Sequence, residues 1–413
     1  MICAKRVLVV MPGQISTTPR MLKAADSLAH AGYDVRVVSA GFTDWARDAD
    51  QRLAASRPWS WVPVEHGRER APAVNALTGV RRHVARTIAR VTSPAAAPWW
   101  ACTRAVARAF DELVARGVEA QPDFVYGGSF GGIPVAYEIG RRCGVPFAID
   151  LEDLHTAESV APDRALHHGL ARRVIEHVLP RAAFATTGSE SMADRYAAEF
   201  GVRPAVLHNV FPIGTPPMLD RPVNARLRLY WFSQTVARGR GIEDMVAAVA
   251  AAGVPAEITV RGRASTEVAD SLQRLSSATP NVTLRLEPPA DPDSMIDLCV
   301  PHDVGFASEH EPVENRQVCL TNKVFTYLLA GMPIAMSDTV AQRKLAAQLD
   351  EAAFVYRAGE LGPLGEWLRQ LATDPLRLRR AREAAWHHAA RRWHWQHEAE
   401  EGQLLSLVAR AIA

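Results

Sequence analysis

The chain has 413 residues, which is too long for one compact core and fits two α/β domains of about 200 residues each. A hydrophobic content of 48% and a net charge of +2 are those of an ordinary globular protein and give nucleic-acid binding no support. The five cysteines are scattered without a C-x-x-C pair, which argues against a disulfide framework or a zinc site.

The chain opens with a strand–helix–strand pattern. Arg6–Met11 is a short run rich in β-branched residues and predicts a buried parallel strand. A helix is expected over residues 19–31, and Asp34–Ser39 reads as the next strand. The loop after the first strand has Gly13 but no G-x-G-x-x-G, so it is a poor dinucleotide fingerprint. This order indicates the first unit of a doubly wound sheet.

A basic amphipathic helix is predicted over Val80–Val91. Valine and isoleucine side chains recur on one helical face, and arginines surround them. Such a helix can lie on an anionic lipid surface, although packing of one side against the protein explains the pattern equally. Peripheral membrane contact therefore remains open at this point.

An acidic cluster follows a later strand of the first half. The strand is predicted over Pro146–Asp150, and Glu152, Asp153 and His155 come directly after it. In open α/β sheets, ligands bind at the carboxyl ends of the strands, so these side chains are catalytic candidates. The alternative is a helix N-terminal turn enriched in acids, which complements the helix dipole.

A proline-rich stretch, Phe211–Arg226, is the best candidate for a linker between two domains. After it the strand–helix pattern restarts, with strands expected at Leu227–Phe232, Ala256–Val260 and Val304–Ala307. The restart predicts a second α/β domain of similar size. Helices are expected again over Pro375–Ala413, at the end of the chain.

The most informative segment is Thr321–Ser337. Asn322 is a good N-cap, and Gly331 followed by a proline ends the helix, so two to three helical turns are bracketed. Lys323 lies in the first turn, where unpaired amides and the helix dipole favour an anion. Only four of the 47 basic residues are lysines. That one of them lies in this segment favours a functional role for its ammonium group. The segment indicates a pocket for phosphate and sugar.

This segment resembles the donor-binding motif of the GT-B glycosyltransferases, most closely the large family four of bacterial sugar transferases. Members have a block like NK-x-F-E-Y-x-x-A-G-x-P-V, and residues 322–334 read NKVFTYLLAGMPI. One departure is Thr326, which stands where the family usually has a glutamate that grips the ribose hydroxyls. A hydroxyl is a weaker and neutral partner.

The resemblance implies further donor-binding residues. Arg240 occupies the place of the lysine in the family's K-G-I, which grips the donor diphosphate, and arginine can pair with phosphate in bidentate fashion. Thr235 stands where many members have an arginine. The paired acids of the family would fall on Val318 and Thr326, so only a loop insertion could bring Glu311 into the role of the first acid. Asn322, Lys323 and Gly13 complete the donor-binding candidates.

The implied fold is GT-B: two doubly wound Rossmann-like domains facing a cleft, with a C-terminal helix that crosses back to the N-terminal domain. We assign residues 1–215 to an N-terminal acceptor domain, 216–395 to a C-terminal donor domain and 396–413 to the returning helix. The start of the sequence leaves no room for a signal peptide, and no run of about 18 apolar residues could span a membrane. We therefore expect a cytoplasmic protein, in peripheral contact with the inner face of the membrane if Val80–Val91 binds lipid.

The implied function is transfer of a sugar from a nucleotide-diphosphate sugar, of UDP or GDP type, to an acceptor hydroxyl, with retention of the anomeric configuration. The acceptor would be a sugar, a lipid-linked or a small molecule, in bacterial polysaccharide, glycolipid or glycoconjugate synthesis. No metal and no other cofactor are expected. An inverting enzyme would need a protein base, for which Asp153 and His155 are the candidates. Two alternatives stay open: a GT-B sugar-nucleotide epimerase or hydrolase, and a catalytically silent relative that binds a sugar nucleotide.

Overall fold

The computed structural model describes residues 4–42, 44–158, 163–222, 225–310 and 313–413. The chain divides into two compact units, each with its own core. Unit 1 comprises Met1–His208, Val313–Asn315 and Glu398–Ala413, and unit 2 comprises Asn209–Pro312 and Arg316–His397.

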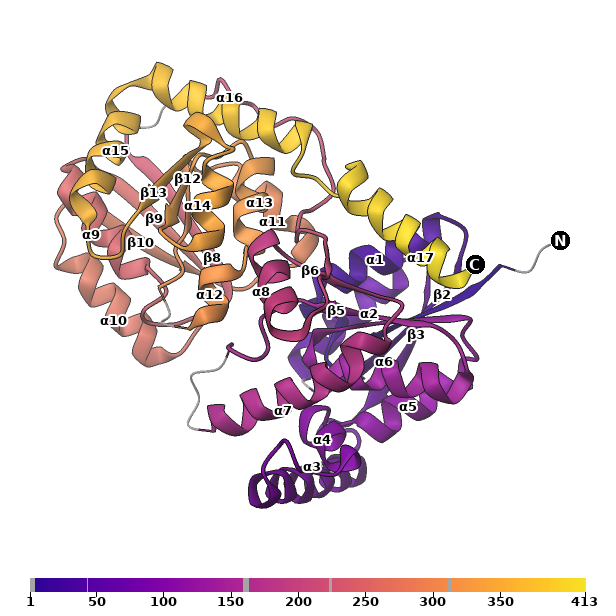
Figure 1. The fold of residues 1–413 in the computed structure, drawn as a ribbon. Helices are drawn as coiled ribbons and strands as arrows, with labels where there is room; N and C mark the ends of the chain where they lie inside the picture. Colours follow the sequence, from indigo (N-terminus) through magenta and orange to yellow (C-terminus); the bar gives the residue numbers. More distant parts are fainter. Residues whose placement is uncertain (1–3, 43, 159–162, 223–224, 311–312) are drawn as a thin grey trace. The chain divides into compact units, whose positions relative to one another are not determined.

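Unit 1 is built on a seven-stranded sheet in the order β3-β2-β1-β4-β5-β6-β7, with parallel neighbours throughout (Figure 1). Its strands are β1 (Arg6–Met11), β2 (Asp34–Gly41), β3 (Ser60–Glu65), β4 (Phe124–Gly128), β5 (Phe147–Leu151), β6 (Phe184–Thr187) and β7 (Ala205–Val206). The helices are α1 (Pro19–His30), α2 (Asp44–Ala55), α3 (Pro72–Thr92), α4 (Trp99–Val106), α5 (Phe110–Glu119), α6 (Ser129–Cys143), α7 (Arg164–Val178), α8 (Glu190–Phe200) and α17 (Gln403–Ile412). The order turns at β1 and β4, which is the switch point where open sheets bind ligands.

Unit 2 repeats this plan with a six-stranded parallel sheet in the order β10-β9-β8-β11-β12-β13 (Figure 1). Its strands are β8 (Leu227–Val236), β9 (Ala256–Ala264), β10 (Val282–Glu287), β11 (Val304–Ala307), β12 (Ile334–Ser337) and β13 (Ala353–Tyr356). The helices are α9 (Ile242–Ala252), α10 (Thr266–Ser277), α11 (Met295–Cys299), α13 (Asn322–Leu329), α14 (Val340–Ala346), α15 (Leu361–Thr373) and α16 (Pro375–Arg391), while α12 (Glu314–Val318) holds residues of both units. Its switch point lies between β8 and β11.

These two sheets confirm the predicted fold class of two doubly wound α/β domains. Strands β1 and β11 have the bounds that the sequence predicts. Two details differ. After the glycine-rich stretch 127–132 the sequence predicts a helix that starts near Pro134, but α6 begins five residues earlier, at Ser129, so Pro134 lies inside the helix. Thr321 rather than Asn322 is the N-cap of α13, and it makes no side-chain cap bond.

The C-terminal segment returns to unit 1, as predicted. Helix α16 belongs to unit 2, and the chain crosses after Trp395, whose amide donates to the Phe211 carbonyl at 2.8 Å. Beyond it, the fully buried Glu400 accepts hydrogen bonds from the His208 amide at 2.6 Å and from His208 Nδ1 at 2.9 Å. The last segment therefore forms part of the core of unit 1. Among the described residues, no helix combines the length and the apolarity needed to cross a membrane.

Candidate functional site

The predicted donor site lies at the carboxyl edge of the sheet in unit 2, where β8 and β11 are neighbours and α13 begins. Helix α13 is held there by Tyr327, whose ring covers Gly305 of β11: a Cβ on Gly305 would lie 2.4 Å from that ring. The Tyr327 hydroxyl is 3.2 Å from both the Tyr230 and the Phe306 carbonyl oxygens. These contacts fix α13 against the neighbouring strands β8 and β11.

Three cationic groups surround one buried carboxylate at this edge. Lys323 Nζ lies 3.3 Å from Glu309 Oε1, and Arg316 lies 3.5 Å from Glu309 Oε2. Lys323 and Arg240 also both lie over the Trp231 ring, at 4.9 Å and 5.8 Å from its centroid. A cation over an aromatic face is stabilised by the ring quadrupole. The cluster joins two predicted residues, Lys323 and Arg240, which are distant in sequence.

The pKa values of the central pair reflect burial and charge together. Burial lowers the pKa of Lys323, with Glu309 opposing and Arg240 adding to the shift. Burial acts to raise the pKa of Glu309, but the charges of Lys323, Arg316 and Arg240 outweigh it and hold the pKa below its usual range. Glu309 is therefore ionised at neutral pH, and Arg240 and Arg316 together outweigh its charge, so the cluster carries a net positive charge that suits an anion.

The loop that carries Arg240 needs glycine on both sides. Gly239 and Gly241 have φ angles of 72° and 78°, in the left-handed region that glycine occupies without strain. A Cβ on Gly241 would lie 2.1 Å from Ser308 Cβ, so this glycine lets the loop approach the end of β11. The loop thereby holds Arg240 over the Trp231 ring, where its charge helps to lower the pKa of Glu309.

Three other predicted donor-binding residues lie on α13 or near the end of β8. Thr326 is fully buried, and its hydroxyl donates to the Asn322 carbonyl at 3.0 Å, within the helix. Asn322 is the first residue of α13, and Thr235 is exposed near the end of β8. Glu311 lies outside the described residues.

Glu309 is a residue of this site that the sequence analysis did not include among the donor-binding candidates, for which it chose Glu311 from the same acidic run. It lies two positions after Ala307, the last residue of β11, with only Ser308 between them. Its amide donates to Ser337 Oγ at 2.9 Å, which ties it to the end of the neighbouring strand β12. The feature of the sequence that could have identified Glu309 is its position just after a predicted strand.

A second cluster, in unit 1, contains the three predicted catalytic residues. They follow β5, the neighbour of β4, and Gly13 follows β1 on the other side of β4, so all lie at the carboxyl edge of one sheet. Glu152 accepts from Ser129 Oγ at 3.0 Å, and Asp153 Oδ1 accepts from Asn315 Nδ2 at 2.7 Å. His155 Nδ1 lies 3.0 Å from Glu158 Oε2.

Glu152 has the most perturbed carboxyl group of this cluster. Burial, followed by repulsion from Asp153 and Asp150, raises the pKa of Glu152 to about 7. Such a group can both accept and donate a proton near neutral pH. Asp150 itself is engaged elsewhere, since it forms a bidentate pair with Arg20 of α1 at 2.6 and 2.9 Å.

The imidazole ring of His155, in the same cluster as Glu152, is held in one orientation by its neighbours. Its ring stacks on Phe130, with centroids 5.1 Å apart, and Glu158 bridges it to His167 Nε2 at 2.9 Å. Burial acts to lower the pKa of His155, but the Glu158 carboxylate outweighs it and raises that pKa. Its Nε2 is buried and has no hydrogen-bond partner among the described residues. The cluster therefore offers a titratable carboxyl group and an oriented imidazole.

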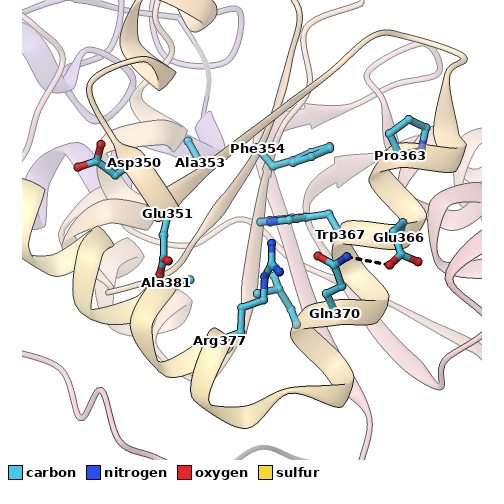
Figure 2. Close-up of a pocket in the computed structure, with 11 residues that line it drawn as sticks. Asp350, Glu351, Ala353, Phe354, Pro363, Glu366, Trp367, Gln370, Arg377 and Ala381 are labelled. Atoms are coloured by element: carbon cyan, nitrogen blue, oxygen red, sulfur yellow. Dashed lines mark hydrogen bonds between the residues drawn. The ribbon is translucent and has the colours of Figure 1, made fainter.

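A separate pocket of about 420 Å³ lies in unit 2, against the edge strand β13 (Figure 2). Helices α15 and α16 supply most of its walls, and the rings of Phe354 and Trp367 stack in it with centroids 5.2 Å apart. None of the predicted site residues lines it.

The comparisons with known proteins concern the fold. No protein-family model matches this sequence. A search of curated proteins gave no significant match. Solved structures that resemble the chain over nearly its whole length include HepE of Anabaena in complex with UDP and glucose, with 13% identity, a TM-score of 0.68 and 99% of each chain covered.

Two further solved structures have the same arrangement. Sucrose-phosphate synthase from Thermosynechococcus elongatus has 12% identity and a TM-score of 0.65, with 98% of each chain covered. A glycosyltransferase from Rickettsia africae has 10% identity and a TM-score of 0.64, with 100% of this chain and 99% of that one covered. At such identities the likeness concerns the fold alone, and that fold is the GT-B fold of glycosyltransferases.

Proposed function

We propose that the protein is a glycosyltransferase that moves a sugar from a nucleotide-diphosphate sugar to an acceptor hydroxyl. The observation that carries the proposal is the group of cations Lys323, Arg240 and Arg316 around Glu309, at the start of a helix and at the carboxyl edge of a parallel sheet. A diphosphate needs such an arrangement, because its charge grows as the bond to the sugar breaks.

A uridine diphosphate sugar is the donor that we propose first. HepE has been solved with UDP and with UDP-glucose, and its fold matches over almost the whole chain. In the proposed reaction the acceptor oxygen forms a bond to the anomeric carbon, and the bond from that carbon to the diphosphate breaks. The departing phosphate oxygen takes up the proton of the acceptor hydroxyl. Lys323 and Arg240 would stabilise the departing diphosphate, while Glu309 holds the Lys323 ammonium in position.

The finer features of the proposal follow the family resemblance. We propose retention of the anomeric configuration, no bound metal, and an acceptor from bacterial polysaccharide, glycolipid or glycoconjugate synthesis. Proton NMR of the first product distinguishes retention from inversion, and activity in EDTA tests the requirement for a metal. Inversion would instead assign the base to the unit 1 cluster, where the candidates Asp153 and His155 lie with Glu152.

A silent sugar-nucleotide-binding relative is the second candidate. It is favoured by Thr326, whose hydroxyl is used inside the helix and whose side chain replaces the usual glutamate. Binding of a nucleoside diphosphate without turnover, across a wide panel of acceptors, would support this candidate over the first.

The decisive experiment measures thermal stability with UDP, GDP, ADP, TDP and CMP. A ligand at 100 times its dissociation constant adds about 2.7 kcal/mol, which shifts the midpoint by several degrees. We expect one diphosphate to stabilise the native protein and to lose this effect in Lys323→Met and in Arg240→Gln. Lys344→Met, the same change at an exposed lysine of α14, is the matched control.

The variants separate loss of the site from loss of the fold. Arg240 is only partly buried, so Arg240→Gln should fold even if Lys323→Met does not. If no diphosphate stabilises the native protein, or if both variants still respond like the Lys344→Met control, the proposed donor site is wrong.

A further inference from the structure

Helix α3 of unit 1 buries small side chains and exposes large aliphatic ones, which is the reverse of what a helix that packs only on its own protein does. Its buried side chains are the small residues Thr78, Ala85 and Ala89. Its large aliphatic residues are exposed instead: Leu77 by 47%, Val80 by 62%, Val84 by 45% and Val91 by 81%. A surface helix ordinarily buries its larger apolar residues and exposes its polar ones.

These exposed residues form one continuous stripe. Their spacings of three, four and seven residues place Leu77, Val80, Val84 and Val91 on a single helical face. Of the ten large apolar side chains exposed among the described residues, five lie between Leu77 and Trp100, the fifth being Trp100 itself at 46%. Such clustering exceeds the scattered exposure of single apolar residues that needs no explanation.

The surroundings of the stripe are strongly basic. The sequence has no aspartate or glutamate between Glu69 and Asp111, and in that interval it has seven arginines: Arg70, Arg81, Arg82, Arg86, Arg90, Arg104 and Arg108. Four of these are in α3.

Only some of these arginines are engaged in ion pairs with other parts of unit 1. Arg81 pairs with Glu112 at 2.6 Å, and Arg86 pairs with Asp163. Arg82 and Arg90 form no ion pair within the described part of the chain. The helix therefore offers uncompensated positive charge beside exposed aliphatic side chains.

We propose that this face of α3 is a docking surface for an anionic lipid bilayer, in which the aliphatic stripe enters the interface and the arginines meet the headgroup phosphates. Figure 1 shows α3 at the margin of unit 1, packed on α4 and away from the sheet. An interfacial helix needs both elements, apolar side chains for the acyl boundary and basic ones for the anionic surface.

Other occupants fit this face less well. A second copy of the chain would bring two rows of arginines together without a compensating acid in the same segment. A nucleic acid would pair with the arginines but would leave four aliphatic side chains against phosphate and sugar, where they gain little.

The test is co-sedimentation of the full chain with vesicles of phosphatidylcholine alone and of equal parts phosphatidylcholine and phosphatidylglycerol. We expect binding to the anionic vesicles, weak or no binding to the neutral ones, and a marked decrease at high salt. The double variant Val80→Ser, Val84→Ser should lower the affinity by about tenfold or more, because the stripe loses much of its apolar surface.

The control is Met218→Ser with Leu376→Ser, which removes side chains of similar exposure, 68% and 67%, elsewhere on the protein. This control should bind vesicles as the native chain does. Arg82→Gln with Arg90→Gln should reduce both the affinity and its dependence on salt.

Three results would overturn the proposal: no binding to anionic vesicles, equal binding by the Val80→Ser, Val84→Ser variant, or a native dimer that this variant converts to a monomer. Because α3 contains none of the proposed donor-binding or catalytic residues, nucleotide binding measured in parallel tests the proposed function independently.

Discussion

At the scale of residues, the donor site depends on the ion pair between Lys323 and Glu309. Both side chains are almost fully buried, with 4% and 1% exposed. Removing one partner of a buried pair leaves the other charge uncompensated, which costs more than the pair itself contributes. The pair is therefore a structural element of unit 2 as well as a candidate part of the site.

Lys323→Met should lower the free energy of unfolding by about 3 kcal/mol, at the lower end of the usual cost since Arg316 still faces Glu309. The double variant with Glu309→Gln should cost less than the sum of the two single changes. Urea denaturation of the four proteins in this cycle measures the coupling. Strict additivity would mean that the two groups do not interact.

Glu152 makes the stability of unit 1 depend on pH. An ordinary glutamate titrates at 4.5, and burial with the neighbouring acids raises the pKa of Glu152 to about 7 in the folded state. The folded state thus binds this proton more tightly than the unfolded state does. The contribution of Glu152 to stability is fully present below pH 4.5 and is lost as the pH rises through about 7.

Glu152→Gln should abolish this loss, so the variant gains stability relative to the native protein between pH 4.5 and about 7. Denaturation at the two ends of that window measures the difference. Ser129→Ala removes the hydroxyl that donates to Glu152 and should raise the pKa of Glu152 further, which steepens the loss. A difference between native and Glu152→Gln that does not change with pH would refute this account.

At the scale of elements, the loop between β8 and α9 shows how glycines position a cation. Gly239 and Gly241 have the same left-handed conformation but different surroundings. Nothing lies within 4 Å of a Cβ built on Gly239, whereas one on Gly241 would meet Ser308. The two positions therefore separate backbone strain from steric overlap.

Gly241→Ala should destabilise the protein by about 2 to 3 kcal/mol, because strain and overlap add. Gly239→Ala, the matched control with strain alone, should cost about 1 kcal/mol. Diphosphate affinity should fall clearly in Gly241→Ala only, since the overlap moves Arg240 away from Glu309. Denaturation and calorimetric titration test this, and equal effects of the two variants would contradict it.

At the scale of the whole molecule, two separate cores and one returning segment set the pattern of stability. Glu400, far along the chain, is fully buried in unit 1, where it bonds to His208. The donor-site cations belong to unit 2. A change in one unit should therefore be detectable in that unit first.

Glu400→Gln should increase amide hydrogen exchange in peptides of unit 1, because it weakens two buried hydrogen bonds at a cost of about 2 kcal/mol. A bound diphosphate should instead slow exchange in α13 and the loop before α9. Glu383→Gln, a change at a half-buried residue of α16 in unit 2, is the control. Equal changes across both units for every perturbation would mean that the chain unfolds as one cooperative body.

Much of the fold is encoded locally, in the alternation of short apolar strands with helices that end at glycine. Strand β1 and the segment Asn322–Gly331 follow from periodicity and end signals alone. The edge strands β3 and β13 were not predicted from the sequence. Pro63 interrupts the pattern in β3, and a proline is tolerated there because an edge strand need not donate every ladder bond.

The sequence by itself determined the fold class, the lysine at the start of α13 and the acidic cluster after β5, since each depends on neighbours in the chain. Tertiary structure alone decided that Glu309 faces Lys323, that Arg240 lies over Trp231, and that α3 exposes its aliphatic stripe. The physical reason is that strands distant in sequence become neighbours only when the sheet forms. Burial, which sets both the pKa values and the exposed faces, is likewise a property of the folded chain.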